Sequence, residues 1–169
     1  NLSLAGSWDA LPGIGDVGVW TSTVLGANST VLGGNMNLQG IRIVAPGGLV
    51  TIGAGNTLTL GASGIDMNAA TQDLTIQSGL TLQAARGQIW NVTTGRTLTV
   101  NTGAFARSAA ATLNVQGAGS VVTSTITNDA TGIIGSWATF GSGASTRYAM
   151  VSGGVITGFT GTAAAAPSA

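Results

Sequence analysis

Few side chains in this sequence could carry out acid–base or metal chemistry, and all of its acids are Asp. The sequence has no His and no Cys, which excludes Ser-His-Asp and Cys-His nucleophile systems and the common zinc sites. Asp66 and Asp73 are about one strand and a corner apart, so they could form a glycosidase pair on adjacent edges. We favour a simpler interpretation, with Asp66 as a solvated strand residue and Asp73 in an Asx-type corner before Leu74. We therefore predict that the chain is not an enzyme and needs neither a cofactor nor a metal ion.

Three further sets of side chains could form a binding surface. Arg86, Arg96 and Arg107 recur at near-even spacing and could stack as a basic stripe for an acidic glycan. We favour isolated edge charges that discourage off-register pairing. Stacked Thr-x-Thr pairs could bind ice, but their irregular spacing argues against one flat face. The four Trp could stack on sugars, but their spread along the chain favours core packing or plugging of the ends; they are Trp8, Trp20, Trp90 and Trp137.

The elements that must position these residues are short β-strands. Apolar residues two positions apart recur with a small or polar residue between them, which is the alternation of a strand with one buried face. The pairs are Val50/Ile52, Leu58/Leu60, Ile65/Met67, Leu74/Ile76, Leu80/Leu82, Leu98/Val100 and Leu113/Val115. The 28 Gly argue against long helices, because Gly costs about 1 kcal/mol at each helical position relative to Ala.

Short strands at this close and even spacing fit either a β-solenoid or, as the alternative, a β-sandwich. Approximate repetition of phrases such as "NTLTLGASG" and "GRTLTVNTG" favours the solenoid, as does the lack of Asn-Gly and Asp-Gly hairpin turns. We expect an all-β fold with three parts. Residues 1–16 form an N-terminal strand and loop, residues 17–159 form the β-helix, and residues 160–169 form a flexible tail or linker.

The central segment "LTLGASGIDMNAATQDLTIQSGLTLQAARGQIWNVTTGRTLTVNTG" resembles the passenger repeats of very large bacterial autotransporter-like surface proteins. The segments "GIIGSWATFGSGASTRYAMVSGGVITGFTG" and "SWDALPGIGDVGVWTSTV" are similar to other elements of the same proteins. The resemblance implies a right-handed parallel β-helix on a cell surface or in an extracellular filament. Members of that family are usually far longer than this chain, which implies one module or a subunit that gains length by association.

Charge and composition limit the partners. Charged residues make up 6% of the sequence and the formal net charge is zero, whereas ordinary globular chains are about 25% charged. A neutral surface does not attract nucleic acid, and no apolar run is long enough to span a membrane. A neutral surface is compatible with packing against copies of the same chain. We therefore expect a homopolymer, with no nucleic acid and no membrane insertion.

The predicted function is that of a structural subunit or module of an extracellular bacterial filament or surface layer. The two open ends of a β-helix are unpaired strand edges, and a head-to-tail contact between them would propagate into a fibre. In this hypothesis the N-terminal strand adds to the neighbouring subunit, and the assembly interface consists of Leu2, Leu4, Val155, Ile156 and Phe159. The alternative is an adhesin-type module that binds glycans or the surface of a host or neighbouring cell.

Overall fold

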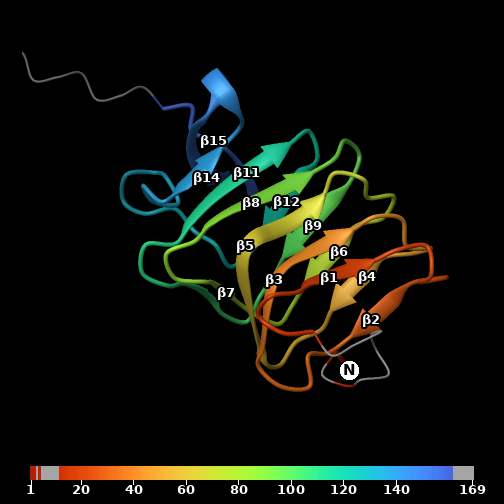
Figure 1. The fold of residues 1–169 in the computed structure, drawn as a ribbon. Helices are drawn as coiled ribbons and strands as arrows, with labels where there is room; N and C mark the ends of the chain where they lie inside the picture. The colour runs from red at the N-terminus through yellow and green to blue at the C-terminus, as the bar shows by residue number, and fades with distance from the viewer. Residues whose placement is uncertain (3, 5–11, 162–169) are drawn as a thin grey trace, which may run out of the picture.

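The structure, a computed structural model, describes residues 1, 2, 4 and 12–161 of the chain. These residues form a parallel β-solenoid of about five turns, with strands stacked coil on coil (Figure 1). The β-solenoid predicted from the alternating pattern is confirmed, and the alternative of a β-sandwich is not observed. In the part of the chain that the structure describes, no helix is long and apolar enough to cross a membrane.

The described fold contains fifteen strands and one short 3₁₀ helix, η2 (Gly143–Ser145). The strands are β1 (Val17–Trp20), β2 (Asn28–Thr30), β3 (Met36–Ile43), β4 (Val50–Ile52), β5 (Thr57–Met67), β6 (Leu74–Ile76), β7 (Gly79–Leu82), β8 (Gly87–Val92), β9 (Thr97–Val100), β10 (Phe105–Arg107), β11 (Thr112–Gly117), β12 (Ser120–Thr123), β13 (Ala138–Phe140), β14 (Arg147–Ser152) and β15 (Val155–Gly158).

Strand pairing divides the solenoid into three faces. Face 1 contains β7, β10 and the first halves of β3 and β5. Face 2 contains β1, the second halves of β3 and β5, β8, β11 and β13. Face 3 contains β2, β4, β6, β9 and β12. A coil takes 22 to 24 residues on face 3, where Ser29 pairs with Thr51 and Thr51 with Thr75.

The bend between faces 1 and 2 depends on glycine. Gly40 of β3 pairs with Gly64 of β5, and a Cβ atom on Gly40 would lie 2.6 Å from the Gly64 carbonyl oxygen. Gly64 has a φ of +57°, a conformation that residues with a side chain rarely adopt, and its Cβ would meet the backbone of Ile89. The bend therefore requires glycine both for close approach and for its backbone angle.

The core is a set of aliphatic ladders, because inward side chains of successive coils lie in register. On face 3 one ladder runs Val50–Leu74–Leu98–Val121, and the next runs Ile52–Ile76–Val100. These side chains are at most 2% exposed. Burial of each Val, Leu or Ile contributes about 1.5–3 kcal/mol, so stacking coils supplies the stability that a single coil lacks.

The C-terminal end of the solenoid is closed by an antiparallel hairpin. Strand β14 pairs with β13, β15 pairs with β14, and β15 also pairs with β12 through Val122 and Val155. Gly153 and Gly154 both have positive φ and connect the two hairpin strands. The sequence predicts an open apolar edge in this segment. That expectation is wrong, because the hairpin joins the C-terminal edges of faces 2 and 3 into one continuous path of strands.

Candidate functional site

The structure places the two candidate carboxylates on different faces. Asp66 lies on face 2, where its Oδ2 forms a half-exposed ion pair with Arg42 Nε of the preceding coil at 3.1 Å. Its Oδ1 accepts a hydrogen bond of 2.9 Å from the backbone N–H of Asn68. The Asx-type turn predicted at Asp73 therefore occurs at Asp66. Asp73 precedes β6 on face 3, so the two residues do not form one acid–base site.

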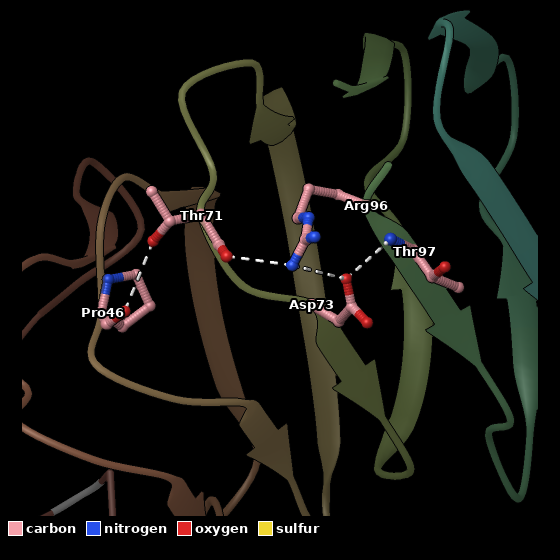
Figure 2. Close-up of polar contacts among 5 residues, drawn as sticks. All are labelled: Pro46, Thr71, Asp73, Arg96 and Thr97. Atoms are coloured by element: carbon pink, nitrogen blue, oxygen red, sulfur yellow. Dashed lines mark hydrogen bonds and ion pairs between the residues drawn. The ribbon is translucent and has the colours of Figure 1, made fainter. Parts of the chain in front are cut away.

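Asp73 links three coils at the corner before face 3 (Figure 2). Its Oδ1 accepts a hydrogen bond of 3.0 Å from the backbone N–H of Thr97 and lies 3.8 Å from Arg96 Nη1. The same Nη1 donates to the Thr71 carbonyl oxygen at 2.9 Å, and Thr71 Oγ1 donates to the Pro46 carbonyl oxygen at 3.4 Å. This arrangement holds consecutive coils in register. In the part of the chain that the structure describes, no three acidic side chains gather into a metal site.

The three Arg do not form one stripe. Arg86 lies in the turn between β7 and β8, whereas Arg96 lies in the turn between β8 and β9, at a different corner of the coil. Arg107 ends β10, donates from Nη1 to the Ala111 carbonyl oxygen at 3.0 Å, and lies over the Trp137 ring. The structure therefore brings Arg107 to an aromatic ring but does not align it with Arg96.

The threonines align better than their spacing in the sequence predicts. Thr51, Thr75 and Thr99 occupy one outward column of face 3, with Ser29 before them and Val122 after them. Coils of slightly different length absorb the irregular spacing. The column is a single row, because the residues on either side of each Thr in the strand point into the core.

The tryptophans have different surroundings. Trp90 is fully buried on face 2, and Trp20 is almost fully buried beside Asn28. Trp137 is partly buried at the C-terminal end, where it stacks on Phe105 with ring centroids 6.2 Å apart. Trp8 lies outside the described residues. Core packing therefore accounts for Trp20 and Trp90, whereas Trp137 is partly buried and packs against the core from its outer side.

The residues predicted to form the assembly interface lie at opposite ends of the solenoid. Leu2 is buried, and its backbone N–H donates to the Val31 carbonyl oxygen of its own chain at 2.8 Å. Leu4 is 57% exposed. Val155 and Ile156 belong to β15, and Phe159 follows it and donates from its backbone N–H to the Tyr148 carbonyl oxygen at 2.7 Å. These three C-terminal residues thus belong to the closing hairpin.

Exposed apolar side chains concentrate at the N-terminal end, where sequence reasoning singled out Leu4 but not the others. Of the nine large hydrophobic residues exposed in the described part of the chain, six precede β3. We call them the N-terminal surface: Leu4, Ile14, Val17, Val19, Leu25 and Val31. Strands β1 and β2 lie at this end. They are the first and last strands of the described path, so each pairs with one described neighbour. The two ends of the described strand path and the exposed apolar side chains therefore occur together.

Comparison of the chain with protein-family models, with curated proteins and with solved structures finds no match. The likeness to autotransporter passenger repeats therefore stays a prediction that rests on the sequence phrases alone.

Proposed function

We propose that this chain is a structural module of an extracellular bacterial surface assembly, and that copies join through the N-terminal surface. The observation that carries the proposal is that both ends of the described strand path, β1 and β2, coincide with exposed apolar side chains. Unpaired strand edges recruit further strands unless charge, Pro or a covering element prevents it. In the described part of β1 and β2 there is no charged residue and no Pro.

The geometry favours a joint between two N-terminal ends over a head-to-tail joint. A head-to-tail filament needs a second open edge at the C-terminal end, where the hairpin pairs the strands of faces 2 and 3 on both sides. At the C-terminal end of face 1, β10 is the described strand that pairs with one neighbour, β7. A twofold contact between two N-terminal surfaces instead places β1 of one copy beside β1 of the other, which is a self-complementary and closed arrangement.

The test compares one substitution at each end of the solenoid. Val17 is 38% exposed on β1, and Tyr148 is 51% exposed on β14. In a twofold joint, Val17→Lys brings two ammonium groups together, so the dissociation constant should rise by about tenfold or more. The matched control, Tyr148→Lys, should leave it unchanged. Sedimentation velocity over a range of concentrations measures both.

Each other outcome has a distinct meaning. Weakening by both substitutions would overturn the N-terminal joint in favour of a head-to-tail contact, and negative-stain microscopy would then show fibres instead of paired rods. A wild-type chain that stays a single particle at millimolar concentration would overturn self-association itself. Circular dichroism of each variant establishes that the β-solenoid is intact.

A further inference from the structure

A hollow of about 460 Å³ opens on the outer side of face 2, across β8, β11 and β13. Its side walls are outward side chains of successive coils, and the absence of a side chain at Gly87 deepens it beside Thr112. A second hollow of about 440 Å³ adjoins it, since Thr139 lines both, and continues to β14. We call the two together the outer groove. Its volume lies in the range of small-molecule sites.

One column of side chains runs along the outer groove and changes in chemistry at each strand. Ile89 of β8 pairs with Asn114 of β11, Asn114 with Thr139 of β13, and Thr139 with Tyr148 of β14. Ile89 and Tyr148 are 48% and 51% exposed, so the two ends of the column are apolar or aromatic. Between them lie an amide and a hydroxyl. Strands lie about 4.8 Å apart, so the column is about 14 Å long.

Asn114 at the centre of the column lacks a hydrogen-bond partner for its side-chain oxygen. Its Oδ1 is buried and has no donor within the described residues. An unsatisfied buried acceptor is costly, and native structures leave few of them. Because the terminal torsion of Asn is soft, rotation of the amide can present this oxygen to a donor in the groove. The orphan acceptor thus indicates a ligand that carries hydroxyl or amide donors.

Aromatic groups and neutrality narrow the ligand class. Trp137 lines the first hollow, and Tyr148 and Phe159 line the second. All nine residues of the first hollow are uncharged, and the Arg107 guanidinium is held over the Trp137 ring, 5.4 Å from its centroid. Arg147 is the one charged residue among those that line the second hollow. A ligand that offers C–H surfaces to aromatic rings and hydroxyls to amides, without a charge, is a neutral saccharide.

We propose that the outer groove binds a neutral oligosaccharide, with Asn114 as the central acceptor and Trp137 and Tyr148 as apolar contacts. The site lies at the opposite end of the solenoid from the N-terminal surface. It therefore adds a binding activity that does not depend on self-association.

The test is a calorimetric titration of the whole chain with uncharged oligosaccharides of glucose, mannose, galactose and N-acetylglucosamine, which measures the dissociation constant. We expect Asn114→Ala to weaken binding about tenfold, through loss of one hydrogen bond to a buried acceptor. Thr112→Trp should abolish binding, because Thr112 is exposed and lines the groove, so a bulky side chain fills it without entering the core. The matched control, Thr75→Trp on the outer side of face 3, should bind as the wild type does.

A second measurement reports the location of the ligand. Trp137 is partly buried and lines the groove, whereas Trp20 and Trp90 are buried, so binding should shift the tryptophan emission of the wild type and not that of Trp137→Phe. Failure of every neutral oligosaccharide to bind at millimolar concentration would overturn the proposal. Retained binding in the folded Thr112→Trp variant would do the same, and so would binding of acidic glycans alone, which would assign recognition to the Arg side chains.

Discussion

At the scale of single residues, four charged side chains form ion pairs between coils, Arg42 with Asp66 and Arg96 with Asp73. Asp73 illustrates this, since one carboxylate oxygen faces both the Thr97 backbone N–H and the Arg96 guanidinium. The ion pair is long and partly exposed, and such pairs contribute about 0–1 kcal/mol. The hydrogen bond to Thr97 satisfies a partly buried backbone donor, whose loss costs about 1–3 kcal/mol. The hydrogen bond therefore dominates the role of Asp73.

This comparison predicts different effects for two substitutions at Asp73. Asp73→Ala removes the acceptor and should lower the free energy of unfolding by about 1–2 kcal/mol. Asp73→Asn retains an oxygen acceptor and removes only the charge, so it should stay within about 0.5 kcal/mol of the wild type. Urea unfolding followed by circular dichroism measures both. Equal destabilisation by the two substitutions would show that the ion pair with Arg96 is the stronger interaction.

At the scale of elements, the hydrophobic alternation predicts the inward ladders because a strand has a side-chain period of two and glycine marks the corners. It does not predict the closing hairpin. Gly-Gly pairs occur at residues 33–34, 47–48 and 153–154, and only the last connects two antiparallel strands. A turn dipeptide alone does not say whether the next strand returns beside its predecessor or starts a new coil.

The outer groove and the Asp73 link also escape prediction from the sequence, for a related reason. Asn114 and Ile89 become neighbours only through the register between β8 and β11, which depends on the lengths of the intervening corners. Asp73 bonds to Thr97 one coil further along for the same reason. Alternation fixes which side of a strand a residue occupies, whereas its neighbours on the next coil depend on corner length.

The segment between β12 and β13 contains a carboxylate, Asp129, whose protonation should affect stability. The Thr131 hydroxyl and backbone N–H donate to Asp129 Oδ1 at 2.5 and 2.8 Å, and these bonds hold the pKa of Asp129 below its ordinary value. The ionised form is therefore favoured by folding. Its contribution is complete above the ordinary carboxyl pKa of about 4 and is lost as the pH falls through the lowered folded value.

We therefore predict that Asp129→Asn makes the free energy of unfolding less dependent on pH below about 4. Thr131→Val, which removes the hydroxyl donor, should reduce the same dependence in part. Urea unfolding at a series of acidic pH values measures the slopes. Identical slopes for the wild type and both variants would show that Asp129 keeps its hydrogen bonds when protonated or has the same pKa in the unfolded chain.

At the scale of the whole molecule, the solenoid is a rod whose two ends differ. The outer side of face 3 carries a row of Thr, whereas both ends of the described strand path and most of the exposed large apolar side chains in the described residues occur at the N-terminal end. With a formal net charge of zero, long-range repulsion does not oppose contact between copies. Which ends meet is therefore decided by strand edges, and the hairpin β14–β15 controls the C-terminal edge.

Removal of that hairpin should change the mode of association from a closed pair to an open polymer. A chain that ends at Phe140 lacks β14 and β15, which leaves β12 and β13 paired on one side. Both ends of the rod then offer parallel strand edges, and a head-to-tail contact propagates because it does not close. We expect long fibres in negative-stain micrographs of the truncated chain.

Val17→Lys in the truncated chain should suppress these fibres, since each joint would use one N-terminal surface, whereas Thr75→Lys on the outer side of face 3 should not. Truncated rods that stay paired would show that the hairpin does not limit growth, and amorphous aggregates that Val17→Lys leaves unchanged would show that the exposed core, not the strand edge, drives association.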